Sequence, residues 1–408
     1  MDSAEREGLR PKGNVPNLRF PEFQGEWEEL GLSELLDFKN GLNPKPDKFG
    51  KGIKFISVMD ILNNAVITYD CIKASVDVTE KELSDFSVEK GDILFQRSSE
   101  TLEDVGRANV YMDDKTAVFG GFVIRGKKKG EYDPRYFNYL LRSPFARKRI
   151  IPMGAGAQHF NIGQEGLSKV KLHFANIEEQ KEIGKMLSLL DERISTQNKI
   201  IEDLKKLKCA IIEKHYLQAK LHKYKICDLG VPFSVGSLSK EDLSEKGHEC
   251  ILYGELFTTY DCVINEVKSH TNKIANTTLS QKGDLVFPSS TTVDAVSLIS
   301  PSVIDIPNVI LGGDMFGIHI DKKFNAYYLS YYINLIARKK LAIYAKGSTI
   351  IHLHYNDIAN AQLLLPELCE QDKIAKCMIA EDNKIKVEEQ LLTKLEKQKQ
   401  YLLRQMFV

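Results

Sequence analysis

The chain has 408 residues, of which 43% are hydrophobic and 27% are charged. This length exceeds one ordinary hydrophobic core and predicts two or three domains of a soluble globular protein. Its 56 basic residues balance its 56 acidic residues, which argues against strong binding of a polyanion by the chain alone but leaves room for local basic stripes. The sequence has no apolar run of membrane-spanning length, no secretion signal and no CxxC pair. We therefore expect a cytoplasmic protein with no membrane partner, no metal site and no disulfide framework.

The N-terminal half begins with a polar stretch, residues 1–14, which is predicted to be a disordered tail. A globular domain is predicted over residues 15–177. Patterns typical of β-strands occur in four runs, at Lys54–Val58, Gly91–Phe95, Lys115–Phe119 and Gly121–Ile124. Helical spacing follows over Pro134–Ile151, where the proline suits a first helical turn. This domain is therefore predicted to be α+β with a largely β core.

Two long helices are predicted, over residues 178–218 and 367–408, with a second globular domain over residues 219–366 between them. In both helices, seam positions recur at alternating spacings of four and three residues. The second seam carries Glu381, Glu388 and Lys399, so that helix should be unstable alone in water. Its simplest partner is the first helix; the alternative is that each helix packs on its own domain or on another chain. The residues predicted to pair the helices or to bind a partner are Ile183, Leu187, Leu190, Ile194, Ile201, Leu204, Ile211, Ile385, Leu392, Leu395 and Leu402.

An internal repeat relates the two halves of the chain. The segment Lys90–Phe95 (KGDILF) returns as Lys282–Phe287 (KGDLVF), and at the same spacing Gly120-Gly121 returns as Gly312-Gly313. After one deletion, Glu179-Gln180 matches Glu370-Gln371. Such collinear matches indicate a tandem duplication, the alternative being a coincidental similarity of two α/β domains. The expected fold class is α+β: two similar, mostly β domains separated by two long helices that form an antiparallel coiled coil, with a pseudo-two-fold internal repeat.

The sequence lacks the common catalytic motifs. No GxxxxGK[ST], GxSxG, HExxH or GxGxxG pattern occurs. The nearest string to the Asn/Asp-Pro-Pro-aromatic motif of adenine methyltransferases, Asn43-Pro44-Lys45-Pro46, does not fit it. His352 and His354 lie two residues apart, but no third metal ligand accompanies them. We therefore expect a binding module rather than an enzyme.

Three kinds of segment could contact double-stranded DNA. Basic residues neutralise phosphates, the polar loop after each KGD strand offers donors to base edges, and the glycine-containing loops allow close backbone approach. The alternatives are a solvated helix face, a plain strand-to-strand turn and neutral drift of a surface loop. The candidate residues for base or backbone contact are Gln96, Arg97, Ser98, Ser99, Lys127, Lys128, Lys129, Arg147, Lys148, Gln158, His159, Asn161, Ser289, Ser290, Thr291, Arg338, Lys339, Lys346, Ser348, Thr349 and His352.

Taken together, these features resemble the specificity subunit of type I restriction–modification enzymes. The opening Leu18–Phe23 (LRFPEF), followed by Gly25-Glu26-Trp27, is similar to the start of that family. The KGD strands and Leu252–Leu256 (LYGEL) resemble its target-recognition domains, and Ile177–Ile183 (IEEQKEI) resembles its domain-to-helix junction. Asn176 stands where the family usually has proline, whereas Pro366 keeps that residue type in the second copy. No single motif is very specific, but the repeated order is.

The resemblance implies a function for each part. Each domain would read one half of a split, asymmetric DNA target, and the helix pair would set the spacing between the half-sites. Two modification subunits would bind the helices and carry S-adenosylmethionine and the adenine-methylating site. Restriction subunits would add ATP- and magnesium-dependent translocation and cleavage. The chain itself would bind no cofactor and catalyse nothing.

Two other classes of function stay open from the sequence alone. An autonomous two-domain DNA-binding regulator, or an anti-restriction decoy of the same shape, would need no methyltransferase partner. A nuclease with an unrecognised pair of metal-binding carboxylates would cleave DNA with magnesium alone. Co-purification with modification subunits tests the first class, and a cleavage assay on the isolated chain tests the second.

Overall fold

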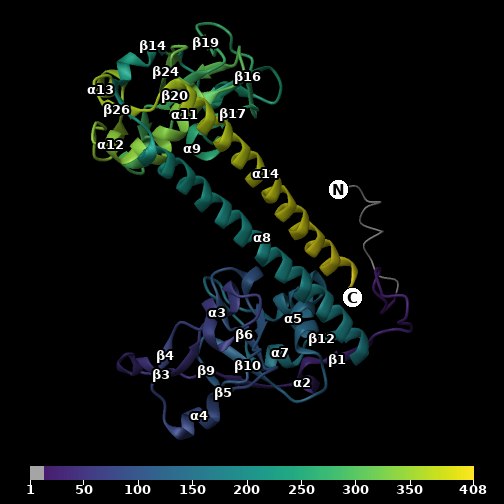
Figure 1. Ribbon diagram of the computed structural model, residues 1–408. Helices are drawn as coiled ribbons and strands as arrows, with labels where there is room; N and C mark the ends of the chain where they lie inside the picture. Colours follow the sequence, from purple (N-terminus) through teal and green to yellow (C-terminus); the bar gives the residue numbers. More distant parts are fainter. Residues whose placement is uncertain (1–12) are drawn as a thin grey trace. The chain divides into compact units, whose positions relative to one another are not determined.

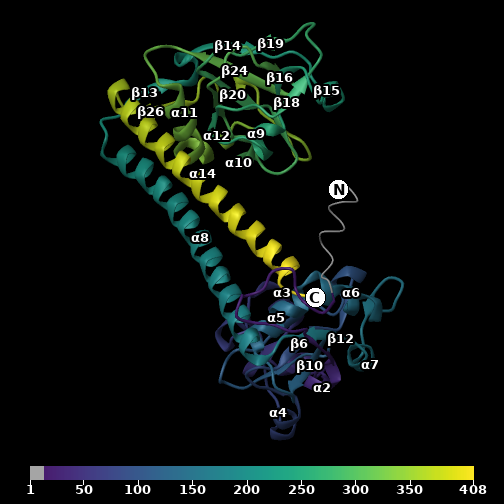
Figure 2. The ribbon, with the colours of Figure 1, turned by 90° about the vertical axis from the view of Figure 1, so that its right-hand side faces the viewer.

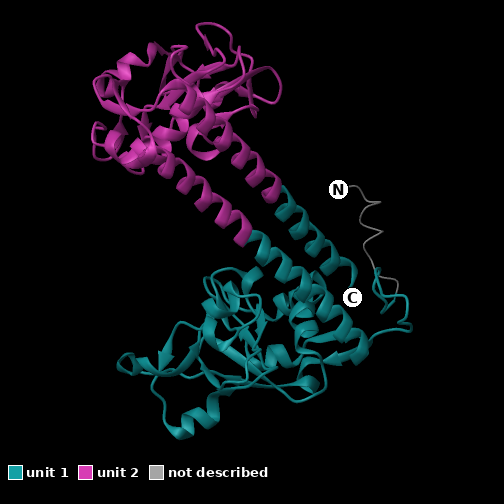
Figure 3. Cartoon of the chain, in the orientation of Figure 1, with its two compact units in different colours: residues 1–198, 390–408 teal, residues 199–389 magenta. Residues whose placement is uncertain are grey.

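The structure is a computed structural model that describes residues 13–408. The chain divides into two compact units, unit 1 with residues 1–198 and 390–408 and unit 2 with residues 199–389 (Figure 3). The unit boundary falls inside both long helices, so each unit contains one globular domain and a segment of each helix. The predicted tail, residues 1–14, lies mostly outside the described residues. Asn14 is described, and its carbonyl accepts a hydrogen bond from the Trp27 N–H (2.8 Å).

The domain of unit 1 combines short strands with short helices (Figure 1). Its strands are β1 (Glu28–Gly31), β2 (Leu36–Asn40), β3 (Phe49–Ile56), β4 (Ser75–Val76), β5 (Ser87–Val88), β6 (Ile93–Gln96), β7 (Ser98–Ser99), β8 (Ala108–Val110), β9 (Ala117–Phe119), β10 (Val123–Lys128), β11 (Phe160–Asn161) and β12 (Lys171–Phe174). Its helices are α2 (Leu32–Leu35), α3 (Val58–Asn63), α4 (Glu80–Phe86), α5 (Pro134–Arg142), α6 (Pro144–Ile150) and α7 (Gln164–Ser168).

The domain of unit 2 has a matching set of elements. Its strands are β13 (His222–Lys225), β14 (Gly230–Ser234), β15 (Leu243–Ser244), β16 (His248–Leu252), β17 (Val263–Ile264), β18 (Ser269–Thr271), β19 (Thr278–Leu279), β20 (Asp284–Pro288), β21 (Ser290–Thr291), β22 (Ser302–Ile304), β23 (Ile310–Gly312), β24 (Met315–Ile320), β25 (Ile351–His352) and β26 (Gln362–Leu365). Its helices are α9 (Glu255–Thr258), α10 (Ala295–Leu298), α11 (Ala326–Tyr332), α12 (Arg338–Ala342) and α13 (Tyr355–Ile358), with a π-helical turn at Ile333–Ala337.

The two domains share a similar sheet topology, with one additional edge strand in each main sheet of unit 2. In unit 1 the sheets run β2-β10-β6-β8 and β4-β3-β9-β5, and in unit 2 they run β14-β24-β20-β22-β17 and β15-β18-β16-β23-β19. Each second sheet contains a parallel pair at the equivalent place, β3 with β9 and β16 with β23. Two-stranded pairs also correspond, because β1-β12 matches β13-β26 and β7-β11 matches β21-β25. The predicted fold class, two similar and mostly β domains, is confirmed.

The repeated KGD motif is a turn at the entry to a central strand. Gly91 and Gly283 have φ values of 95° and 92°, a left-handed conformation that glycine adopts without strain. The aspartate that follows closes the turn, because Asp92 accepts from the Glu89 N–H (3.0 Å) and Asp284 from the Gln281 N–H (2.7 Å). Burial raises the pKa of Asp92 despite these bonds. Turn chemistry therefore accounts for this motif without any contact to a ligand.

Two long helices connect the domains: α8 (Ile177–Gln218) and α14 (Leu368–Gln405). Within each unit, their segments lie side by side in both views (Figure 1 and Figure 2). In unit 2 the pairing is antiparallel, because Lys205 meets Glu389 and Lys208, further along α8, meets Asp382, which lies earlier on α14. The predicted antiparallel coiled coil is therefore confirmed, and the alternative of separately packed helices is not.

The buried face of the helix pair follows the predicted seam with one shift at its ends. Ile183, Leu187, Ile201, Leu204, Ile385 and Leu395 are buried, whereas Leu190, Ile194 and Leu392 are half-buried. The burial differs from the predicted seam at Ile211 and Leu402, which are half-buried, whereas the neighbouring residues Ile212 and Leu403 are buried. All four pack against the hydrophobic core of a domain.

A second correction concerns the helix predicted over Pro134–Ile151. The structure has two helices there, because Ser143 ends α5 and caps α6, with its Oγ accepting from the Ala146 N–H (3.2 Å). Pro144 lacks the N–H that would continue a single helix. Among residues 13–408, no helix is both long enough and apolar enough to cross a membrane.

Candidate functional site

One group of predicted residues gathers around the strand pair β7-β11 in unit 1. Ser98 and Asn161 face each other across this pair, and the Ser98 hydroxyl donates to the Asn161 carboxamide oxygen (2.5 Å). Gln158 and His159 are exposed in the loop that precedes β11, and Ser99 is half-buried. Gly156 shapes this loop, with a φ of 142°. We call the strands β7 and β11, with residues 154–159, loop pair 1.

Unit 2 has the corresponding arrangement around the strand pair β21-β25. Ser290 pairs with His352, and Thr291 with Ile351. Lys346, Ser348 and Thr349 are exposed in the preceding loop, where Gly347 has a φ of 121°. We call the strands β21 and β25, with residues 346–350, loop pair 2. The two loop pairs thus share a backbone frame and differ in the side chains that they expose.

Several predicted contact residues are buried within the domains. Gln96 is buried, and its amide donates to the Ser98 carbonyl (2.9 Å), so the structure contradicts a surface role for its side chain. Ser289 and Ser290 are also buried. The physical reason is that each of these residues ends or follows a central strand whose side chains fill the core.

Arg147 and Arg338 are half-buried and bind to the backbone of their own domains. The Arg147 guanidinium donates to the carbonyls of Glu103 (2.8 Å) and Val105 (2.6 Å), and burial lowers its pKa to about 10. Arg338, its counterpart in the repeat, donates to the carbonyls of Val296 (2.7 Å) and Ser297 (3.2 Å). Both arginines therefore hold a loop of their own domain. The next residues, Lys148 and Lys339, are exposed.

The basic run Lys127–Lys129 lies away from loop pair 1. The register of β10 places Val123 opposite Gln96, next to loop pair 1, and Gly126 opposite Ile93, so the lysines continue toward the other end of the strand. Lys127 lies near Glu89 (3.6 Å) and Lys129 near Asp37 (3.6 Å), both as exposed ion pairs. Lys128 donates to the Tyr132 carbonyl (3.1 Å). The structure does not bring these residues together with the loop candidates.

Each domain is joined to the helix pair by an equivalent group of three polar side chains. In unit 1 the Tyr139 hydroxyl donates to Asp191 on α8 (2.7 Å), and Lys399 on α14 forms an ion pair with the same carboxylate (2.5 Å). In unit 2 the Tyr331 hydroxyl donates to Asp382 on α14 (2.5 Å), and Lys208 on α8 donates to that carboxylate. Each lysine also lies over its tyrosine ring. We call these groups the joint triads.

The triads determine where each helix segment rests on its domain. Burial, together with the neighbouring aspartate charge, raises the pKa of Tyr139 and Tyr331 above the ordinary value, so both hydroxyls stay protonated and able to donate well into the alkaline range. The Lys399 position explains one charge on the predicted seam, because its ammonium group reaches across to α8. The repeat contained the signal for these triads, because Asp382 follows Asp191 at the same spacing at which Glu370-Gln371 follows Glu179-Gln180.

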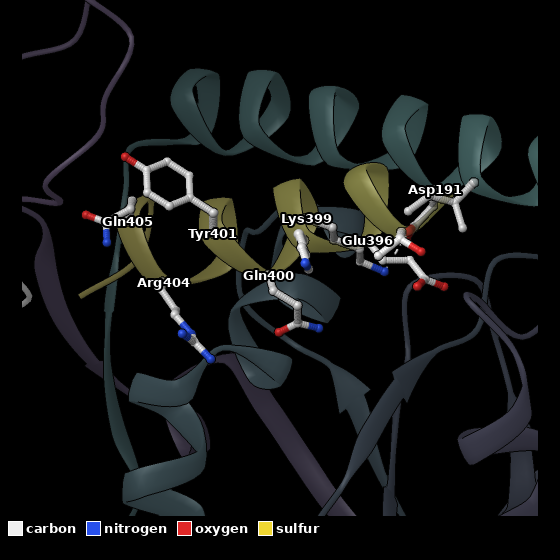
Figure 4. Close-up of a pocket in the computed structure, with 10 residues that line it drawn as sticks. Asp191, Glu396, Lys399, Gln400, Tyr401, Arg404 and Gln405 are labelled. Carbon is white, nitrogen blue, oxygen red and sulfur yellow. Dashed lines mark ion pairs between the residues drawn. The ribbon is translucent and has the colours of Figure 1, made fainter. Parts of the chain in front are cut away.

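The surface of the helix pair in unit 1 carries an open hollow of about 910 Å³. Figure 4 shows the Asp191–Lys399 ion pair at one end of it, with Gln400, Tyr401 and Arg404 along α14. Tyr401 is 57% exposed. On α8, Leu189, Ile200 and Leu207 are exposed as well, at spacings of whole helical turns. The helix pair therefore carries exposed apolar side chains outside its own seam.

The N-terminal segment is tied to the start of α8. Arg19, from the sequence that opens the family resemblance, donates to both carboxylate oxygens of the fully buried Glu179 (2.8 Å each). Trp27 packs against Tyr136 and against Phe407 at the end of the chain. At the junctions, Gln180 accepts from the Asp133 N–H and Gln371 from the Asn325 N–H (3.0 Å each). The glutamine of the repeated Glu-Gln motif thus connects domain and helix in both copies, whereas Glu370 pairs with Lys373 of its own helix.

Catalytic geometry is not evident in the described part of the chain. Residues 13–408 contain no group of three or more His, Cys, Asp or Glu side chains placed to hold a metal ion. His352 and His354 stack on each other, with ring centroids 6.2 Å apart. The arrangement offers hydrogen-bond donors, basic side chains and apolar surface, which are means of molecular recognition.

Comparison with protein families identifies a match over most of the chain. A model described as "Type I restriction modification DNA specificity domain" matches residues 24–206 and 226–397. Two curated relatives from Methanocaldococcus jannaschii are each 24% identical to this chain. The putative type I restriction enzyme MjaX specificity subunit covers 96% of this chain and 95% of its own length. The type I restriction enzyme MjaVIII specificity subunit covers 95% and 92%, respectively.

Solved structures show the same fold. The S subunit of a type I restriction–modification system from M. genitalium aligns over 97% of this chain and 99% of its own, with a TM-score of 0.61 and 17% identity. A chain from a study of complex assembly and conformational transition in a type I system aligns over 92% and 96%, with a TM-score of 0.56 and 13% identity. At these identities the likeness establishes the architecture and not the details of any site.

Proposed function

The chain belongs to the family of type I restriction–modification DNA specificity proteins, and on this basis we propose that each of its domains reads one half of a split, asymmetric DNA target. One observation carries the proposal: the same fold occurs twice in the chain, with different side chains exposed on equivalent loop pairs. Asn161 in loop pair 1 is replaced by His352 in loop pair 2. Two domains that share a backbone frame but expose different side chains are suited to recognising two different half-sites.

The contact residues of this proposal are the candidates that remain exposed or half-buried on the domains; Arg97, Ser98 and Thr291 are the half-buried ones. In unit 1 they are Arg97, Ser98, Gln158, His159 and Asn161, with Lys148 for phosphate contact. In unit 2 they are Thr291, Lys346, Ser348, Thr349 and His352, with Lys339 for phosphate contact. Hydrogen bonds to base edges would give specificity, while the lysines would add a salt-sensitive, sequence-independent contribution.

The long helices would act as the spacer between the half-sites. An α-helix with the 42 residues of α8 is about 63 Å long, and successive major grooves of B-DNA lie about 34–36 Å apart. This length supports the spacer role. The exposed apolar residues Leu189, Ile200 and Leu207 on α8 and Tyr401 on α14 support binding of partner proteins to the same helices.

The partners would be those of a type I system. We expect two modification subunits on the helix pair, which would supply S-adenosylmethionine and methylate adenine, and restriction subunits that would use ATP and magnesium. This chain would catalyse neither reaction and would act in the cytoplasm. The absence of recognisable catalytic motifs in the sequence supports a non-catalytic role.

Exchange of one domain tests this proposal. Residues 15–177 are replaced by the corresponding domain of another specificity subunit, and the hybrid is expressed with modification subunits. Methylome sequencing should show that one half-site changes while the other half-site and the spacer length persist. A simultaneous change of both half-sites would contradict the modular assignment. Specific DNA binding without any modification subunit would instead favour an autonomous regulator.

A further inference from the structure

The two domains carry equivalent surface pockets with opposite chemistry. The pocket in unit 1, which we call the apolar pocket, has a volume of about 440 Å³ and lies at Gly120-Gly121. The pocket in unit 2, the polar pocket, has a volume of about 500 Å³ and lies at Gly313, in the matching Gly-Gly pair. Their frames correspond, because Leu42 bridges Gly120 in parallel and Gly236 bridges Gly312 in parallel.

Close packing explains why glycine recurs at this place. A Cβ added to Gly121 would lie 1.9 Å from the Asn43 Oδ1 atom, and one added to Gly312 would lie 2.1 Å from the Leu238 Cβ atom. Both Gly-Gly pairs therefore let the segment that follows β2 or β14 pass close to the end of β9 or β23, respectively. The residue after each pair is free to differ, and it is Phe122 in unit 1 and Asp314 in unit 2.

Several large apolar side chains that line the apolar pocket are exposed to solvent. Phe122 is 67% exposed, Met59 is 60% exposed and Phe49 is 42% exposed, and all three line the pocket. Phe49 packs edge-on against Phe55, which keeps that wall in place (5.2 Å between ring centroids). Three exposed apolar side chains around one hollow indicate a contact surface rather than a solvated one.

Loop pair 1 lies at the rim of this apolar pocket. Ser98 lines the pocket, and the Arg97 N–H donates to the Phe122 carbonyl (2.9 Å). The Arg97 guanidinium approaches the Gly121 carbonyl (3.4 Å), and the exposed Lys45 follows Pro44 of the pocket wall. The rim is therefore basic and polar around an apolar centre, a combination that complements the edge of a DNA duplex.

The polar pocket replaces this apolar surface with hydrogen-bonding groups. Asp314, Ser237, Asp242 and Lys273 line it. The Lys273 ammonium group donates to Asp242 (3.0 Å), and the Asp242 carboxylate also accepts from the Ser239 N–H (2.8 Å). These bonds and the Lys273 cation lower the pKa of Asp242. A shared protein partner would require similar chemistry at both pockets, whereas two readers of different bases would not.

We propose that the apolar pocket receives the C5 methyl group of a thymine in the half-site read by unit 1, and that the polar pocket hydrogen-bonds to base edges of the other half-site. The thymine methyl is the apolar feature that bases present in the major groove. Phe122 and Met59 contact this methyl, and Arg97 on the rim binds a neighbouring guanine or phosphate. This assignment rests on the proposed function and adds the base feature and the residues that select it.

The test compares thymine with deoxyuridine, which lacks only the methyl group. The target is first determined by methylome sequencing, and the domain exchange identifies the half-site of unit 1. Binding of the chain reconstituted with its modification subunits is then measured on duplexes in which each thymine of that half-site is replaced in turn. At one position the loss of a buried methyl should weaken binding about fourfold.

Substitutions in the pocket should remove this sensitivity. Phe122→Ala should bind the natural target more weakly and should lose the preference for thymine over deoxyuridine. Phe122→Leu, which keeps an apolar side chain, should retain part of that preference. Asp314→Ala is the matched control, because it occupies the equivalent position in unit 2. It should leave the preference in the first half-site unchanged while weakening binding to the second half-site.

Three results on the DNA target would overturn the assignment. They are a first half-site without thymine, binding that is insensitive to every deoxyuridine, and an undiminished preference for thymine in Phe122→Ala. Each leaves the proposed function intact as long as domain exchange changes one half-site. If Phe122→Ala instead abolishes co-purification with a modification subunit, the apolar pocket is a protein contact and the assignment is wrong.

Discussion

Replacing Asp382 with alanine should destabilise unit 2 by about 2–4 kcal/mol. In the joint triad of that unit, the Asp382 carboxylate accepts from the Tyr331 hydroxyl (2.5 Å) and from the ammonium group of Lys208. The substitution removes the charge-assisted hydrogen bond from Lys208, which contributes about 1.5–3 kcal/mol, and leaves the Tyr331 hydroxyl without an acceptor, which costs about 1–3 kcal/mol. The two contributions are not fully additive, because Lys208 and Tyr331 contact each other in the same group.

The structure supplies a matched control on the same two helices. Lys205 and Glu389 also form an ion pair between α8 and α14 (2.7 Å), but their side chains are 58% and 48% exposed, compared with 14% and 29% for Lys208 and Asp382. An exposed pair contributes about 0–1 kcal/mol. Glu389→Ala should therefore lower the free energy of unfolding far less than Asp382→Ala does.

Hydrogen exchange measured on individual peptides can locate the loss of stability in each of the two variants. Peptides from residues 199–218 of α8 should lose protection in Asp382→Ala, and thermal unfolding of unit 2 should begin about 4–16 °C lower, at about 2–4 °C per kcal/mol. Tyr331→Phe combined with Asp382→Ala should cost less than the sum of the two single changes. Equal losses in Asp382→Ala and Glu389→Ala would refute the view that the joint triad holds the helix on its domain.

Three further perturbations test other contacts. Arg19→Met should destabilise unit 1 by about 3–5 kcal/mol, measured by urea unfolding, because it leaves a fully buried carboxylate unpaired; a loss below 1 kcal/mol would show that water or another cation replaces the arginine. Leu207→Lys should abolish co-purification with a modification subunit while the circular dichroism spectrum stays unchanged, and Lys206→Ala should leave both intact; unimpaired assembly of Leu207→Lys would exclude this face of α8. Because the folded-state pKa of Tyr139 is raised above the unfolded value of about 10, its contribution to stability is full below that pH and is lost as the pH rises beyond it. The unfolding temperature should fall less between pH 9 and pH 11 for Tyr139→Phe than for the unchanged chain. Equal falls would assign the loss of stability at alkaline pH to other groups.

The candidate site was only partly predictable because exposure is a tertiary property. Gln96 and Arg97 are adjacent polar residues after the same strand, and in the sequence they were equal candidates. The structure buries Gln96 in the domain and leaves Arg97 half-buried at the rim of the apolar pocket. Arg147 and Lys148 separate in the same way, since the arginine binds carbonyls of a loop more than 40 residues away in the chain.

Only some features of the apolar pocket could be predicted from the internal repeat. The matched Gly-Gly pairs marked equivalent backbone positions, and the replacement of Phe122 by Asp314 was visible beside them. Met59 and Phe49, however, belong to segments far from Phe122 in the sequence, and no periodicity connects them. Their gathering around one hollow depends on the parallel pairing of β3 with β9, which brings distant segments to one sheet edge.

The sequence by itself determined the duplication, the two long helices and the position of the KGD turns. These features depend on local chemistry: heptad spacing favours a paired helix, and a glycine followed by an aspartate favours a closed turn wherever it occurs. Only the tertiary structure decided which polar side chains reach the surface, which charges meet in the joint triads and which residues form the two pockets. Those outcomes depend on contacts between residues such as Lys208 and Asp382, which lie far apart in the chain and are brought together only by the packing of whole elements.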